Sequence, residues 1–119
     1  MELQDKMRIV QELVPGKQVT LAHIIANPDE ILYKKLGLDP AVEYSRSAIG
    51  ILTLSPAETA IIAGDIAIKA SGAQLGFVDR FSGTVILTGT YSEVEASMKA
   101  VTEYAEETLG FTVCKITKT

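Results

Sequence analysis

The sequence predicts an α+β fold in which helices pack on one face of a sheet. Three observations support this class: apolar runs of strand length, long helical patterns with matched start and stop residues, and the way these segments alternate. Their order is strand, strand, helix, strand, helix, strand, strand, helix, strand. A chain of 119 residues suits one domain that buries roughly two-thirds of the surface its unfolded chain exposes.

The sequence predicts a short N-terminal strand that needs a partner. Apolar and polar residues alternate there until Pro15-Gly16 interrupts the pattern, and the strand comprises Ile9, Val10, Gln11, Glu12, Leu13 and Val14. So short a strand does not form a stable sheet alone. Residues 1–16 are therefore expected to be an arm, separate from a single domain over residues 17–119.

The domain is expected to open with a strand and a short helix. The strand covers Gln18–Ala26, with Val19, Leu21, His23 and Ile25 on one side. The helix covers Pro28–Leu36 and ends at Gly37, and a polar connection follows over Gly37–Ser47.

The stretch Ala48–Gly89 predicts a compact unit of strand, helix, strand, turn and strand. Ala48–Leu54 is a strand, and the helix Ser55–Ser71 starts with a capping box of Ser55 and Glu58. Gly72 is placed to close this helix in the left-handed conformation. After the helix come a strand at Ala73–Arg80, a turn at Phe81-Ser82-Gly83 and a strand at Thr84–Thr88.

The C-terminal third predicts a helix and a strand. The helix Ser92–Leu109 has a capping box of Ser92 and Glu95, a stop at Gly110, and an apolar stripe of Val94, Met98, Val101, Ala105 and Leu109. The final strand covers Phe111–Ile116.

The helix Pro56–Ala70 differs from an ordinary surface helix, because apolar and small residues surround it almost completely. Such a helix is covered on two sides. The chain is also 47% hydrophobic. Both observations indicate that a neighbouring subunit covers part of the surface.

Composition excludes several classes of protein. No apolar run is long enough to span a membrane, and Met1–Arg8 has no apolar core of a signal peptide. Net charge is −4 and the basic residues are scattered, which argues against nucleic-acid binding. The one cysteine, Cys114, cannot form an internal disulfide and fits a reducing cytoplasm.

The search for catalytic groups yields none, and we expect no metal site, no cofactor and no enzyme activity. His23 lies in an apolar strand, so a hydrogen-bonded histidine at the core or an interface is favoured over a ligand or base. Cys114 has no histidine near it in sequence and is favoured as a buried structural thiol. Pro15-Gly16-Lys17 lacks the remaining residues of a phosphate loop.

Two pairs of charged residues leave alternatives open. Asp79 and Arg80 form either a solvated hairpin tip or, together with Phe81, Ser82 and Gly83, a charged loop that lines an opening. Asp65 and Lys69 form either an exposed helical pair, or Lys69 reaches a neighbouring particle.

Four segments together resemble one family. They are Val14–Pro28, Ala48–Pro56, Gly76–Gly83 and Phe111–Thr119. The family is the circularly permuted hexameric shell proteins of bacterial microcompartments, of the propanediol, choline and ethanolamine utilisation (PduU, CutR and EutS) types. The resemblance covers about Arg8 to Thr119.

The resemblance implies a permuted BMC fold, with a cyclic homohexamer that tiles into the microcompartment shell in the cytoplasm. It implies contacts with other shell proteins and with encapsulated enzymes. Residues Ile9–Val14 would form an axial β-barrel that caps the pore, Asp79–Gly83 would be the pore loop, and Lys69 would lie at the hexamer edge. Two positions depart from the family pattern, because Asn27 stands where an edge arginine is usual and Gly72 stands near the usual place of an asparagine.

Two other classes of function compete with the shell protein. The first is an oligomeric small-molecule-binding regulator with its ligand near Asp79–Gly83. An enzyme ranks third, because the chain offers one histidine and dispersed carboxylates.

Overall fold

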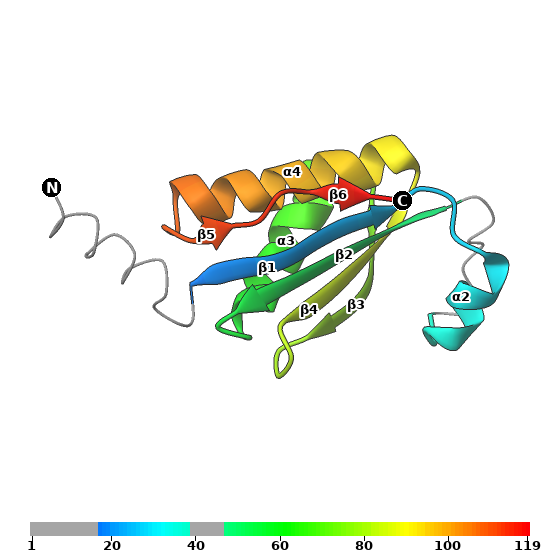
Figure 1. Ribbon diagram of the computed structural model, residues 1–119, viewed down its shortest axis with the longest axis horizontal. Coiled ribbons are helices and arrows are strands. Elements are labelled where there is room, and N and C mark those ends of the chain that lie inside the picture. The colour runs from blue at the N-terminus through cyan, green and yellow to red at the C-terminus, as the bar shows by residue number, and fades with distance from the viewer. Residues whose placement is uncertain (1–16, 39–46) are drawn as a thin grey trace, which may run out of the picture.

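The computed structural model describes residues 17–38 and 47–119. The predicted strand Ile9–Val14 and most of the connection Gly37–Ser47 lie outside these ranges. Over the described residues one sheet has the spatial order β3–β4–β2–β1–β5, with β6 also beside β1 (Figure 1). The strands are β1 Gln18–Ile25, β2 Ala48–Ser55, β3 Gln74–Asp79, β4 Thr84–Gly89, β5 Thr112–Val113 and β6 Thr117–Lys118. The helices are α2 Glu30–Lys35, α3 Thr59–Ala70 and α4 Tyr91–Glu107.

Helices α3 and α4 lie together on one face of the sheet, whereas α2 lies beyond one end of it (Figure 1). The main core fills the layer between these two helices and the strands, and its large, fully buried side chains include Ile24, Leu52, Leu87, Met98 and Val101. A second, smaller cluster holds α2 against the sheet and comprises Tyr33, Leu38, Ile49 and Ile86. The expected α+β class is therefore confirmed.

The centre of the sheet is antiparallel, but one edge is parallel. β1 pairs with β2, β2 with β4, and β3 with β4, all antiparallel. β5 and β6 both run parallel to β1. The segment after α4 therefore returns along the free side of β1, and Thr119 reaches the backbone of Ala26 (2.8 Å).

The predicted final strand Phe111–Ile116 is wrong in its extent. The structure has two short strands there, and the residues between Val113 and Thr117 belong to neither. The backbone N–H of Cys114 still donates to Val19 (3.1 Å), but the next paired residue, Thr117, lies opposite His23. Strand pairing with β1 is thus interrupted between these two contacts, although the alignment is the same on both sides of the gap.

The predicted side-chain pattern of β1 is also wrong. The register shifts between Val19 and Leu21, so the strand changes face at a bulge. Val19, Ala22 and Ile24 are buried, while Leu21 stays 42% exposed. Simple alternation therefore fails after the first residues of the strand.

The predicted start of α3 is wrong as well. Ser55 is the last residue of β2 and pairs with Gln18, so it does not cap the helix. The N-cap of α3 is Glu58, which makes no side-chain capping bond, and the Ser55–Pro56 peptide is cis. A turn in which Thr59 N–H donates to the carbonyl of Pro56 (3.0 Å) leads into the helix.

The capping box of α4 lies two residues earlier than predicted. Thr90 Oγ1 accepts from the backbone N–H of Glu93 (3.2 Å), and Glu93 Oε1 accepts from the N–H of Thr90 (2.9 Å). The predicted box of Ser92 and Glu95 is therefore wrong, since both residues lie inside the helix. The predicted apolar stripe is confirmed, because Val94, Met98, Val101 and Ala105 are all buried.

The predicted helix stops are only partly right. Gly37 and Gly110 take positive φ angles after their helices, as expected. Gly72 does not: α3 ends at Ser71 in an extended conformation. A Cβ on Gly72 would collide with the carboxylate of Glu93, so this glycine makes room for a side chain.

Candidate functional site

The outer face of α3 is apolar and exposed. Its buried face consists of small residues, namely Thr59, Ala60, Ala63, Gly64 and Ala67, which let the helix lie close to the sheet and α4. The large residues point outward: Ile61 is 56% exposed, Ile62 46% and Ile68 44%. The prediction that this helix carries apolar residues beyond one face is confirmed.

The apolar surface continues onto β3, which is the edge strand beside β4. Leu75 is 40% exposed and packs near Gly64 of α3, whereas Phe77 is paired with Ile86 and so lies on the opposite face of the sheet. An edge strand also leaves one row of its backbone groups without partners in the sheet. We call Ile61, Ile62, Ile68 and Leu75 the α3–β3 surface. A patch of this kind is typical of an interface between proteins.

Lys69 and Asp65 lie near the end of α3. Lys69 Nζ bonds to Asp65 Oδ2 at 2.8 Å, one turn earlier on the same helix. The two side chains are 74% and 55% exposed, so water screens the pair. Within the subunit the two residues therefore form an exposed helical pair, and this exposure leaves Lys69 accessible to a neighbouring particle.

The Asp79 side chain stabilises the hairpin that joins β3 to β4. Its carboxylate accepts from the backbone N–H of Phe81 (2.9 Å) and from the hydroxyl of Ser82 (2.8 Å). The Phe81 N–H bond contributes most to lowering the pKa of Asp79, followed by the Ser82 hydroxyl. The N–H of Gly83 also donates to the Asp79 carbonyl (2.9 Å). The Asp79 side chain is thus a structural part of the turn.

Arg80 and Phe81 form the outer part of the hairpin. The Arg80 guanidinium lies 4.9 Å from the centre of the Phe81 ring, and Phe81 is 81% exposed. The tip therefore combines a cation and an aromatic ring, while the nearby carboxylate is occupied within the turn. The sequence places all five residues Asp79–Gly83 in one loop, and the structure keeps them together.

His23 is hydrogen-bonded, as expected. Its Nδ1 lies 2.6 Å from Thr117 Oγ1 and its Nε2 lies 2.9 Å from Thr119 Oγ1. Each ring nitrogen therefore has a hydroxyl partner on the C-terminal segment. This arrangement ties the C-terminal segment to β1.

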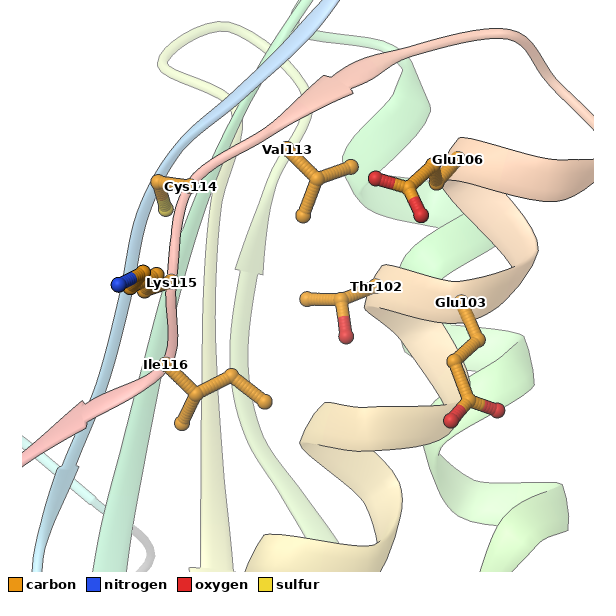
Figure 2. Close-up of a pocket in the computed structure, with 7 residues that line it drawn as sticks. All are labelled: Thr102, Glu103, Glu106, Val113, Cys114, Lys115 and Ile116. Carbon is orange, nitrogen blue, oxygen red and sulfur yellow. The ribbon is translucent and has the colours of Figure 1, made fainter.

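A groove of about 460 Å³ lies between α4 and the segment that joins β5 to β6 (Figure 2). One wall carries Thr102, Glu103 and Glu106, and the other is formed by Val113–Ile116. Figure 2 shows Lys115 directed away from α4. Burial raises the pKa of the Cys114 thiol, so the thiolate is disfavoured. The groove thus lacks an activated nucleophile.

The described residues contain no group of His, Cys, Asp and Glu side chains that could hold a metal ion. Within the same ranges, no helix has the length and apolar character needed to cross a membrane. The surfaces that distinguish this chain are therefore the α3–β3 surface, the charged end of α3 and the hairpin tip.

Comparison with known proteins decides the family. The BMC domain model matches residues 48–117, which is more than half of the chain. The chain belongs to the BMC-domain family of microcompartment shell proteins. It is 57% identical over 112 residues to the bacterial microcompartment shell protein PduU of Salmonella typhimurium, covering 94% of this chain and 93% of that protein. It is 50% identical over 114 residues to the shell protein EutS of Escherichia coli, covering 96% of this chain and 98% of that protein.

A solved structure described as a CutR flat hexamer has the same fold. Its TM-score to this chain is 0.81 at 48% identity, covering 92% of this chain and 96% of that chain. The resemblance proposed from the sequence is therefore confirmed, and the protein is a structural component of a bacterial microcompartment shell. The protein is therefore located in that shell.

Sequence reasoning missed one group of residues that joins α3 to α4. Ser71 and Ser97 lie 26 positions apart, and their hydroxyl oxygens are 2.7 Å apart. The spacing of Thr90 and Glu93 could have revealed the adjacent capping box, since it follows the same pattern that we assigned to Ser92 and Glu95. No sequence pattern could have revealed the serine contact.

Proposed function

We propose that the chain assembles into a cyclic homohexamer that tiles edge to edge with further hexamers and with other shell proteins. The α3–β3 surface is the observation that carries this proposal. Four large apolar side chains, each at least 40% exposed, lie on α3 and the edge strand β3. Burying them against the next subunit of a ring removes the exposed patch and covers the sheet edge.

Replacement of two isoleucines tests the ring. Ile61→Glu together with Ile62→Glu puts charges into the proposed interface without touching the core of the subunit. Light scattering should give the wild type a mass six times the 12.8 kDa of the chain, and the variant a smaller mass. Glu106→Gln, an exposed change on α4, is the matched control and should remain hexameric. A folded wild-type monomer at micromolar concentration would overturn the proposal.

We further propose that the fold is a circular permutation of the standard shell domain. The family match begins at residue 48, yet β1 precedes that residue and lies between β2 and β5 within the sheet. A strand at such a place is integral to the sheet and is no added appendage. On this proposal, β1 and α2 correspond to the last strand and helix of the standard domain.

The end of α3 is our candidate for the hexamer edge. Lys69 is exposed, and its ammonium group has three donors, of which the contact to Asp65 uses one. The remaining donors are available to backbone carbonyls of a neighbouring hexamer. Lateral assembly then depends on Lys69, while the fold of the subunit does not.

The hairpin Asp79–Gly83 is our candidate for the pore loop. Around a six-fold axis, each copy would present the Arg80 and Phe81 side chains, because the Asp79 carboxylate is bound within its own turn. The loop would then offer cations to the axial opening.

Encapsulated enzymes are the expected partners on the inner face of such a shell.

Residues Ile9–Val14 are our candidate for a plug of that opening. They lie outside the described residues, but the chain enters the fold beside β5, where Lys17 O accepts from Thr112 N–H (3.0 Å). Six arms leaving a ring at equivalent points could close into a small barrel, which removes every unpaired strand edge. The arm (residues 1–16) and the domain (residues 17–119) would then have separate roles.

A further inference from the structure

The end of α3 is held by side chains of α4. The last carbonyl groups of a helix have no partners within the helix and need other donors. At Ala67 the donor is the hydroxyl of Ser97 on α4, at 2.6 Å. Both residues are fully buried. Loss of this hydroxyl would leave a buried carbonyl without that donor.

Ser71, directly after α3, makes a second connection to α4. Its Oγ accepts from the backbone N–H of Ala73 (3.0 Å) and lies 2.8 Å from the carbonyl oxygen of Glu93. Ser71 Oγ also lies 2.7 Å from Ser97 Oγ. The two serines therefore join the last turn of α3, the start of the loop to β3, and the first half of α4.

Lys69 lies between these two anchored positions. Ala67 is fixed two residues before it and Ser71 two residues after it. A lysine side chain is long and flexible, so the direction in which its ammonium group can reach depends on the backbone that carries it. A functional group of this kind needs a rigid support to meet a partner repeatedly in one geometry.

We propose that Ser71 and Ser97 are positioning residues for Lys69 in lateral assembly. This inference rests on the proposed edge role of Lys69. The serines themselves contact no neighbour; they fix the end of α3 relative to α4, and thereby fix the place from which Lys69 reaches an adjacent hexamer. Their loss releases the end of α3 while the remaining core of the subunit keeps its packing.

A second buried hydroxyl on α4 provides the matched control. Thr102 Oγ1 donates within its own helix, to the carbonyls of Met98 (3.0 Å) and Lys99 (3.1 Å). Thr102→Val removes a hydroxyl of similar burial from the same helix but breaks no contact with α3. A general effect of destabilising α4 should therefore appear in Thr102→Val as well as in the serine variants.

The experiment compares Ser97→Ala, Ser71→Ala, Ser71→Thr, Thr102→Val and Lys69→Ala in the full-length chain. Hydrogen exchange is measured at the amides of residues 68–72, and sheets are counted by electron microscopy at equal hexamer concentration. We expect Ser97→Ala and Ser71→Ala to exchange about tenfold faster there, which corresponds to the loss of about one hydrogen bond. Both should lose sheets as Lys69→Ala does, while their hexamers persist. Ser71→Thr keeps the hydroxyl and should restore sheets, and Thr102→Val should retain them.

Each contrary result has a distinct meaning. If Lys69→Ala forms normal sheets, the edge role of Lys69 fails, and the positioning role fails with it. If Lys69→Ala loses sheets but both serine variants retain them, only the positioning role is wrong. Unchanged exchange at residues 68–72 would show that the serines do not hold the end of α3. Should Ser97→Ala fail to fold, the partly exposed Ser71 decides the question alone.

Discussion

Lys69 Nζ bonds to Asp65 Oδ2 at 2.8 Å, with both side chains more than half exposed on the last two turns of α3. An exposed pair of this kind contributes about 0.3–0.5 kcal/mol to the free energy of unfolding. Lys69→Ala should therefore change stability very little. If Lys69 bonds a neighbouring hexamer, the same change should abolish or remodel sheets while hexamers persist. Electron microscopy and light scattering of the variant check both parts, and intact sheets or lost hexamers would count against the edge assignment.

Gly83 and Gly110 allow a matched test of the hairpin. Both have positive φ angles, +79° and +72°. A Cβ at Gly83 would collide with the carbonyl oxygen of Leu54, whereas a Cβ at Gly110 meets nothing within 4 Å. Gly110→Ala should lower the free energy of unfolding by about 1 kcal/mol, because alanine is disfavoured in the left-handed backbone conformation. Gly83→Ala adds the collision and should cost about 1–3 kcal/mol more. Urea denaturation measures both, and equal losses would contradict the packing of the hairpin on Leu54.

The pKa of the Asp79 carboxyl group depends on the hydrogen bonds that form the hairpin. Its pKa is lowered, first by the Phe81 N–H and then by the Ser82 hydroxyl. A lowered pKa in the folded state means that the turn is favoured while Asp79 is ionised. This contribution is present above the ordinary aspartate value of about 3.9 and is lost as pH falls through the lower folded value. NMR titration should place the midpoint below about 3.9, and Ser82→Ala should raise it. A midpoint unaffected by Ser82→Ala would refute this account of the turn.

Removal of residues 1–14 tests the proposed plug. The described domain begins at Lys17 and has its own core, so the shortened chain should fold and form hexamers. If the arms close the axial opening, hexamers without them should show an open channel by electron microscopy. An unfolded product, or a strand that pairs within its own subunit, would contradict the plug.

The sequence predicted the features that local residues determine. The stripe on α4 and the stops at Gly37 and Gly110 follow from helical periodicity and from backbone conformations that glycine adopts easily. The exposed apolar surface of α3 was expected because apolar and small residues surround that helix almost completely. The family assignment rested on several segments in combination and was confirmed by comparison.

One error is local, since the capping box of α4 is formed by Thr90 and Glu93, which have the same spacing as Ser92 and Glu95. The other errors concern features that distant residues determine. The face of β1 changes at a bulge that arises in its pairing with β2. Ser55 looks like a cap in the sequence but extends β2 by pairing with Gln18. Gly72 accommodates the carboxylate of Glu93, a residue 21 positions later in the printed sequence. The link between Ser71 and Ser97 likewise exists only after α3 and α4 have packed, so local patterns could not reveal it.

Electron microscopy of the purified full-length protein tests the central claim most directly. The account predicts six-fold particles that join edge to edge into sheets under crowding or mild salt. Discrete monomers or trimers that form no sheets, and that bind a small metabolite saturably near Asp79–Gly83, would contradict it.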